Sequence, residues 1–248
     1  MKIVVCISQV PDTTTKVKVG ENGKSIDPKD VTFIINPYDE FAIEEAIKLK
    51  EKNGGETIAV SVGKESIKET IRKAFAMGID KGVLVKTDEE MDSYSVAKNL
   101  AAVIKDINPD IIFFGKQSID YDNSLVVALT AEFLGLPSIS VVVALDIQGN
   151  NVTAEREIEG GKEIVNATLP AFIGAQKGLN NPRYPNLKGI MMAKSKPIEE
   201  KQPIYTGNKT EIISMRLPKG KSKGKIVGSD ISAVGELVRL LREEAKVI

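Results

Sequence analysis

Short apolar runs alternate with amphipathic stretches along the first 145 residues of the chain. The runs have the length and composition of buried strands, and they fall at 2–8, 57–62, 82–86, 111–114 and 138–145. Between them apolar positions recur with a helical period, which predicts helices near 37–53, 66–77, 93–106 and 123–134. Strands that alternate with helices form parallel sheets with right-handed crossovers. The pattern therefore predicts an α/β fold with a five-stranded, parallel, doubly wound sheet.

Local signals mark where these helices begin and end. Asn36 suits the position before the first helix, and Pro37 suits its first residue, because a proline there loses no helical hydrogen bond. Gly78 and Gly135 follow two later helices at the position where a left-handed backbone is common. The boundaries of the helices are thus predicted independently of the apolar pattern.

Two segments depart from the alternating pattern. The insertion at 9–35 contains the alternating piece "KVKV", and we expect it to form a hairpin beside the sheet. After residue 145 the turn signals "QGNN" and "EGG" separate alternating runs, which predicts an antiparallel extension. We therefore divide the chain into an α/β domain with this extension at 1–175 and a C-terminal arm at 176–248.

The arm combines polar composition with apolar side chains. Residues 176–209 are rich in Asn, Pro, Lys and Gly, which is typical of an extended, exposed segment, yet the stretch "NNPRYPNLKGIMMAKSKP" within it contains five large apolar residues. They are Tyr184, Leu187, Ile190, Met191 and Met192. Apolar content on an exposed segment indicates a docking surface.

A final amphipathic helix is predicted at 230–246. We expect its apolar face to pack on the chain's own domain rather than on a partner. That face consists of Ile231, Val234, Leu237, Val238 and Leu241.

The composition limits which catalytic and redox groups the chain itself can supply. The chain has no histidine, which excludes His-dependent triads and histidine metal sites, and its single cysteine, Cys6, excludes an internal disulfide and a CxxC redox pair. Any redox chemistry must then be carried by a bound cofactor. The formal net charge of zero gives no indication of nucleic acid or an anionic membrane as a partner, and no apolar run approaches the roughly 20 residues that span a bilayer. With no leader recognised before the first strand, we expect a cytoplasmic protein.

The candidate ligand site lies where the predicted strand order reverses. In an open parallel sheet, ligands bind beyond the carboxyl ends of the strands at this point, which here brings together "CISQVPD" and "GKQSIDYDNS". Gly115 permits a close turn, Lys116 offers a cation, and Ser118, Asn123 and Ser124 offer neutral hydrogen bonds. No GxGxxG or P-loop motif is present. The loop is either a nucleotide site that uses the amides of the following helix, or a turn that binds nothing.

The start of the first helix lies at the same edge. A simple helix cap explains Asn36 and Pro37, whereas Tyr38 at an exposed helix start could stack on a ring. Cys6 ends the first strand and is expected to be a small buried residue, because no base accompanies it.

Several stretches together resemble the beta subunit of electron transfer flavoprotein. They are "CISQVPD", "INPYDEFAIEEAIKLKEK", "ETIRKAFAMGID", "FFGKQSIDYD", "TAEFLGLP", "EREIEGGKE" and "NNPRYPNLKGIMMAK", in the family's order over nearly the whole chain. The resemblance implies an adenine-nucleotide-binding fold and a heterodimer. In that heterodimer the alpha subunit holds most of an FAD, and the beta subunit closes over it. It further implies electron transfer from acyl-CoA-type dehydrogenases to a quinone-linked or other acceptor, with no catalytic residue of the chain's own.

The resemblance also implies sites. The family's beta-subunit nucleotide pocket, which holds a structural AMP or a second FAD, falls on Cys6, Asn36, Pro37, Tyr38, Asp39, Val62, Gly115, Lys116, Gln117, Ser118, Ile119, Asp120, Tyr121, Asp122, Asn123, Ser124, Leu125 and Val126. Thr13 and Tyr38 fall where the subunit approaches the flavin ring. The partner-docking loop falls on Arg183 to Met192, with Leu187 at its anchoring position, and includes Arg183, Tyr184, Leu187, Ile190, Met191 and Met192.

One departure from the family pattern affects the nucleotide. Val126 and Val127 stand where a hydroxyl and a glycine are expected, and a valine donates no hydrogen bond to a phosphate. Either the phosphate lies against Asn123, Ser124 and the helix amides, or the pocket is weakened; a second FAD is the less expected ligand. In both cases Asp120 and Asp122 would shape the turn and accept from amides or ribose hydroxyls. The alternatives for the whole chain are a bifurcating subunit that oxidises NADH and a universal-stress-type ATP-binding regulatory domain.

Overall fold

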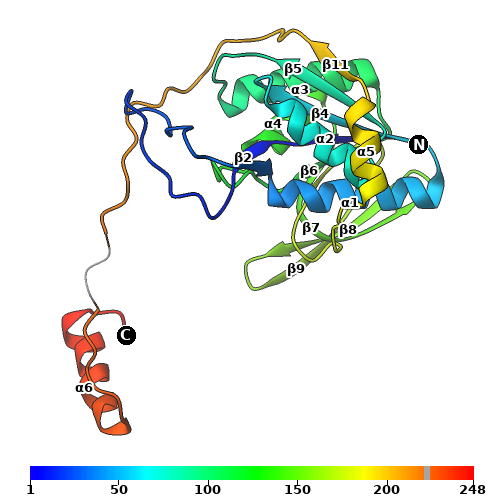
Figure 1. Cartoon of the computed structure of the whole chain (residues 1–248). Coiled ribbons are helices and arrows are strands. Elements are labelled where there is room, and N and C mark those ends of the chain that lie inside the picture. Colours follow the sequence, from blue (N-terminus) through cyan, green and yellow to red (C-terminus); the bar gives the residue numbers. More distant parts are fainter. Residues whose placement is uncertain (221–223) are drawn as a thin grey trace.

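The computed structural model describes residues 1–220 and 224–248. A nine-stranded sheet forms its centre, in the order β11-β5-β4-β1-β6-β10-β7-β8-β9 (Figure 1). Its strands are β1 (Lys2–Cys6), β4 (Glu56–Gly63), β5 (Lys81–Lys86), β6 (Ile111–Gly115), β7 (Ser138–Gln148), β8 (Asn151–Ile158), β9 (Gly161–Thr168), β10 (Ala171–Ala175) and β11 (Ile198–Lys201). Six strands from β11 to β10 pair in parallel, as does β10 with the first part of β7, while β7, β8 and β9 pair in antiparallel fashion.

Helices cover both faces of the parallel part. One buried cluster joins α1 (Pro37–Asn53) and α2 (Ile67–Met77) to the sheet, and a second joins α3 (Ser93–Ile107) and α4 (Leu125–Leu134) to the opposite face. Successive residues of β1 contribute to different clusters, with Ile3 and Val5 on the first face and Val4 and Cys6 on the second. Burial on both faces explains why these strands are uniformly apolar in sequence.

The predicted fold class is confirmed, but the sheet is larger than the five strands predicted. The segment 171–175 was assigned to the antiparallel extension, whereas it forms β10, a parallel strand between β6 and β7. Residues 198–201 form β11 at the edge beside β5. A five-residue apolar run is too short for its pattern to reveal which strands it pairs with.

The insertion forms a small second sheet. Its two ends pair as β2 (Gln9–Pro11) and β3 (Phe33–Ile35), which is the predicted hairpin. The piece "KVKV" at 16–19 forms no strand, and only Val19 makes a bridge, to Ile26. The predicted antiparallel extension is present as β7, β8 and β9.

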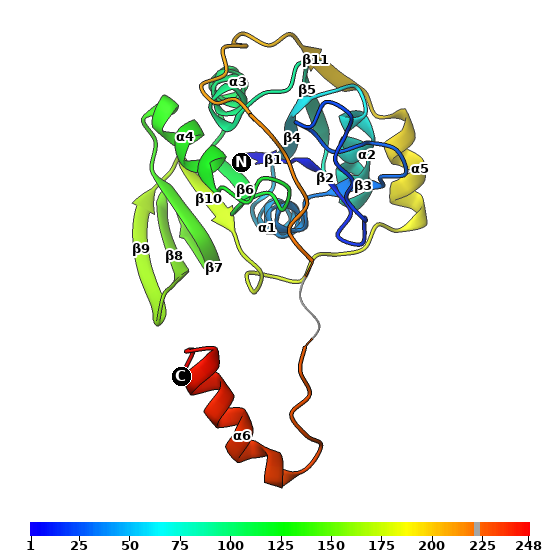
Figure 2. The same cartoon turned by 90° about the vertical axis from the view of Figure 1, so that its left-hand side faces the viewer.

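The C-terminal arm differs from the prediction in two ways. Residues 176–209 are not extended throughout, because they include α5 (Leu187–Ser195) and β11. The final helical segment, a 3-10 turn at Ile231–Ala233, α6 (Val234–Arg239) and a π-helical turn at Leu240–Glu244, stands apart from the body of the molecule (Figures 1 and 2). The expectation that it packs on its own domain is therefore wrong: Ile231 is 90% exposed and Val234 52%. None of the helices in the described ranges is long and apolar enough to cross a membrane.

Candidate functional site

The strand order reverses between β1 and β6, as predicted. From β1 the chain proceeds to β4 and β5 on one side, and β6 then pairs with β1 on the other. The insertion, the start of α1 and the loop between β6 and α4 follow the carboxyl ends of these strands and lie at one edge of the sheet (Figure 2). The residues expected to form the nucleotide pocket are thus brought to one edge from four separate parts of the sequence.

Asp39 is the centre of this edge. The side chain is buried, and its carboxylate accepts hydrogen bonds from the Ser8 amide at 2.7 Å, the Ser8 hydroxyl at 2.9 Å and the Gly115 amide at 3.1 Å. Burial raises the pKa of this carboxyl to about 6, and the hydrogen bonds from Asn36, Ser8 and Gly115 offset part of that effect. Asp39 therefore links the end of β1 to the end of β6 by hydrogen bonds. Sequence reasoning missed Ser8, whose role shows only in these contacts.

Gly115 is required by the approach of α1 to β6. A Cβ atom at this position would lie 2.4 Å from Asp39 Oδ1 and 2.7 Å from the carbonyl carbon of Tyr38. The predicted close turn at Gly115 is therefore present, and the backbone that approaches it belongs to the start of α1.

Asn36 precedes α1 but does not cap it in the expected way. Its side chain makes no cap hydrogen bond. Instead its amide nitrogen donates to Asp39 Oδ1 at 2.8 Å and to the Gln117 carbonyl at 2.9 Å, and its oxygen accepts from the Ile119 amide at 3.3 Å. A polar side chain with 0% exposure thus joins the start of α1 to the β6–α4 loop.

The β6–α4 loop is held by bonds among its own polar residues. Asp122 Oδ1 accepts from the Gln117 side chain, Gln117 Oε1 accepts from the Ser124 hydroxyl at 2.9 Å, and Asp120 Oδ1 accepts from the Tyr121 amide at 2.9 Å. Asp122 and Ser124 have left-handed backbones, with φ of 53° and 52°. Ser124 directly precedes α4, which therefore begins at Leu125, two residues later than predicted. Both aspartates accept hydrogen bonds within the turn they were predicted to shape.

The side chains at the start of this loop and those at the start of α4 differ in their burial and contacts. The Lys116 ammonium lies 4.9 Å from the centre of the Tyr38 ring, which places a cation and an aromatic face together. Leu125 and Tyr121 are exposed, whereas Val126 packs against the cluster under α4 and Val127 is buried within it. Asn123 donates to the Ser93 hydroxyl at 2.8 Å.

The remaining predicted residues lie around this edge. Cys6 is buried, and burial together with the nearby Asp39 raises the pKa of its thiol well above the ordinary value, which keeps it protonated and unreactive. Val62 is partly buried near the end of β4, and Thr13 is exposed in the insertion after β2. Within the described ranges no group of three or more Cys, Asp or Glu side chains is arranged to hold a metal ion.

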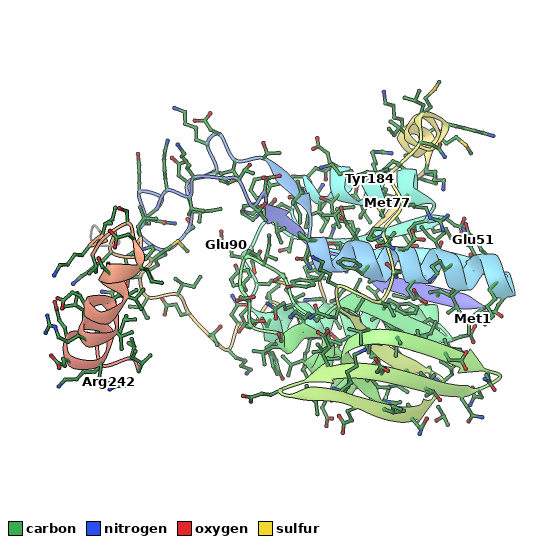
Figure 3. The ribbon with its side chains drawn as sticks, turned by 90° about the horizontal axis from the view of Figure 1, so that it is seen from below. Met1, Glu51, Met77, Glu90, Tyr184 and Arg242 are labelled. Atoms are coloured by element: carbon green, nitrogen blue, oxygen red, sulfur yellow. The ribbon has the colours of Figure 1, made fainter. Side chains whose placement is uncertain are left out.

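The apolar residues of the arm form a second candidate surface, which we call the docking segment and define as residues 183–195. Tyr184 is 95% exposed, Leu187 81% and Met191 73%, and Ile190 and Met192 are exposed as well. Figure 3 shows Tyr184 and Met77 at the opposite end of the molecule from Arg242 of the C-terminal helical segment. The docking segment and the C-terminal segment are therefore separate surfaces.

Arg183 differs from the other residues of the docking segment. Its guanidinium donates to Glu44 at 2.9 and 3.0 Å and to Glu51 at 2.6 and 3.0 Å, all on α1. Arg183 thus anchors the approach to α5 from within the molecule. Sequence reasoning also missed Arg72, which binds carbonyl groups at the end of α5.

The fold and this edge define a doubly wound α/β protein of the type that binds its ligand at the switch point of the sheet. The sequence model of the electron transfer flavoprotein domain matches residues 25–218. The chain is 42% identical over 259 residues to the electron transfer flavoprotein subunit beta of Bacillus subtilis (strain 168), with 100% of both chains covered. It is 34% identical over 256 residues to the subunit of that name from Homo sapiens, covering 100% of this chain and 99% of the relative. The chain belongs to the electron transfer flavoprotein beta-subunit family.

Proposed function

We propose that this chain is the beta subunit of a heterodimeric electron transfer flavoprotein that carries electrons on an FAD held mainly by its alpha subunit. The observation that carries the proposal is the convergence of the Asp39–Gly115 contact, the Lys116–Tyr38 pair and the insertion at one edge of the sheet. The chain contains no histidine and its one thiol is buried, so it offers no redox group of its own. The flavin supplies the redox chemistry, and the chain's residues position and shield it.

The proposed nucleotide pocket has donors for an adenine nucleotide. The first amides of an α-helix have no partner within the helix. The Leu125 amide donates to Asn123 Oδ1 at 3.3 Å, so the amides that follow it at the start of α4 would serve a phosphate, and Lys116 in the same loop offers a positive charge. Val126 stands where the hydroxyl is expected and packs against the core cluster, so the phosphate is left to these amides. We propose AMP as the ligand held here, with Tyr38 and Thr13 facing the flavin of the alpha subunit.

The docking segment would receive an acyl-CoA-type dehydrogenase. Leu187 is exposed at the start of α5, and a buried apolar anchor commonly carries much of an interface's binding energy. We expect Leu187→Ala to raise the KM for the dehydrogenase by about tenfold while flavin content stays the same. Loss of flavin instead would show that the segment supports the cofactor site.

Counting ligands on the purified heterodimer tests the function. We expect one FAD and one AMP per heterodimer after denaturation and chromatography. Two FAD per heterodimer would indicate a bifurcating subunit that oxidises NADH. A chain that binds ATP, forms no complex with an alpha subunit and shows no flavin absorbance would indicate a regulatory domain. Absence of any adenine nucleotide from the native complex would remove the claim of a nucleotide pocket.

A further inference from the structure

The docking segment is held against α2 by its small residues. Gly189 packs so closely that a Cβ atom would lie 2.5 Å from the carbonyl oxygen of Ala76, and Ala193, four residues on, is only 3% exposed. Residues four apart lie on one face of a helix, so this face rests on the end of α2. The larger side chains Leu187 and Met191 share another face and are exposed.

A helix as short as α5 needs support from outside. It has nine residues, and an isolated helix of that length is unstable in water because too few bonds follow its costly nucleation. The Asn186 side chain accepts from the Gly189 amide at 2.7 Å and so caps its start.

Arg72 supports the other end. Its Nη1 donates to the carbonyl oxygens of Ala193 at 2.8 Å and Lys194 at 2.9 Å, and lies 3.3 Å from that of Lys196. The last carbonyls of a helix have no helical partner and carry partial negative charge, so a guanidinium on α2 is well suited to bind them.

Arg183 fixes the approach to the helix. Besides its four guanidinium bonds to Glu44 and Glu51, its own amide donates to Glu44 at 3.0 Å. The Glu44 side chain is 7% exposed, so this carboxylate is held in a fixed place on α1. Nearby, the Asn180 side chain donates to the Phe41 carbonyl at 2.9 Å.

We propose that Arg72 and Arg183 are positioning residues for docking, which hold α5 in the shape in which Leu187 and Met191 meet a partner's apolar surface. The inference rests on the proposed docking role of this segment. Both arginines bind atoms of the segment or of α1 and leave the exposed apolar side chains free. They order the docking segment before binding, and this reduces the conformational entropy that is lost when the complex forms.

Steady-state transfer from a dehydrogenase to the heterodimer tests the inference. We expect Arg72→Met to raise the KM for the heterodimer about fivefold, with kcat and flavin content unchanged, because the contact surface is present but less ordered. Lys105→Met, which removes a charge from the last turn of α3 far from the docking segment, is the matched control and should stay within about twofold. Arg72→Lys keeps a donor at the site and should recover part of the loss.

A double variant shows whether Arg72 acts through Leu187. If it does, adding Arg72→Met to Leu187→Ala should raise KM by less than the product of the two single effects. Hydrogen exchange of residues 187–195 should be faster in Arg72→Met than in Lys105→Met. Arg183→Met should act in the same direction; if loss of the partner of buried Glu44 prevents folding, Arg72→Met carries the test alone.

Two results would overturn the inference. One is a KM for Arg72→Met equal to that of Lys105→Met while Leu187→Ala raises it, and the other is a double variant whose two effects simply multiply. If Leu187→Ala itself leaves KM unchanged, the docking role fails, and the positioning role fails with it.

Discussion

Asp39 shows how one side chain can join two strand ends and a helix. It lies in the first turn of α1, yet its bonds reach Ser8 after β1 and Gly115 at the end of β6. The sequence placed Asp39 at the start of a helix and, through the family resemblance, in the nucleotide pocket. The long-range partners that bury it could not be predicted, since they depend on which strands are neighbours.

Replacing Gly115 tests the close approach at this site. We expect Gly115→Ala to lower the free energy of unfolding by about 1–3 kcal/mol, because the new methyl group overlaps the backbone of Tyr38 and the Asp39 carboxylate. Urea denaturation measures the change. Gly161→Ala is the control, since a Cβ there meets no atom within 4 Å. Equal stability of the two variants would show that α1 can shift at no cost.

The raised pKa of Asp39 predicts a pH dependence of stability. Its pKa is about 6 in the folded chain, chiefly through burial, and about 3.9 in the unfolded chain, so the folded chain binds the proton more tightly between those values. The contribution of Asp39 is therefore largest below about pH 4 and is lost as pH rises through about 6, by roughly 1.4 kcal/mol per pH unit at its steepest.

Comparison with Asp39→Asn, which cannot titrate, isolates this contribution. The free energy of unfolding of the parent chain minus that of the variant should fall between about pH 4 and pH 6 and become constant above. Chemical denaturation at several pH values measures it. A difference that rises with pH would mean that the hydrogen bonds from Ser8 and Gly115 outweigh burial.

At the scale of elements, the sequence predicted what is determined locally. The helix expected at 37–53 is observed at Pro37–Asn53, since the signals for its start at Asn36 and Pro37 and its helical apolar period are local to the segment. β10 and β11 were missed because their identity as sheet strands depends on distant partners in β6 and β5. α5 was missed because its small face, Gly189 and Ala193, becomes a packing surface only against α2. The edge where β1 and β6 end at the reversal of strand order was predicted because strand-order rules place it without knowledge of side-chain contacts; that it binds a nucleotide stays a proposal.

Asn99 on α3 anchors the arm after β11. Its side chain is 1% exposed, donates to the Tyr205 carbonyl at 2.7 Å and accepts from the Ile204 amide at 2.8 Å. We expect Asn99→Ala to weaken this attachment by about 1–3 kcal/mol, because the backbone groups of the arm lose buried partners. Limited proteolysis should then cut the chain faster between 203 and 207. Asn53→Ala, at the exposed end of α1, is the control, and identical cleavage rates in the two variants would contradict the prediction.

At the scale of the whole molecule, α1 connects the two proposed functional surfaces of the body. Its first turn carries Asp39 and Tyr38 at the proposed nucleotide edge, and its later turns carry Glu44 and Glu51, which bind Arg183. One helix of 17 residues thus sets where the docking segment lies relative to the proposed flavin. A rigid connection of this kind fits a carrier whose task is to place a cofactor near a partner.

The C-terminal helical segment is the third surface, and in the described part of the chain its apolar side chains are exposed, with Ile231 90%, Val234 52% and Leu237 45% exposed. The sequence predicted helical structure in this segment because it follows from local periodicity, although the α-helix itself spans only Val234–Arg239, between a 3-10 turn and a π-helical turn. It could not predict what covers the apolar face, since an amphipathic pattern requires burial without specifying the partner. An exposed apolar face on a projecting helix is typical of a subunit interface, and under the proposed function we expect the alpha subunit to cover it.

Leu237→Gln tests this assignment. Leu237 is 45% exposed, so the substitution should leave the thermal unfolding of the isolated chain unchanged. In the heterodimer the same side chain would be buried, and we expect affinity for the alpha subunit to fall about tenfold, which titration calorimetry measures. Glu236→Gln introduces the same residue at the neighbouring position, away from the apolar face, and should bind like the parent. If both variants bind equally well, the alpha subunit is held by other surfaces and this helix has a different partner.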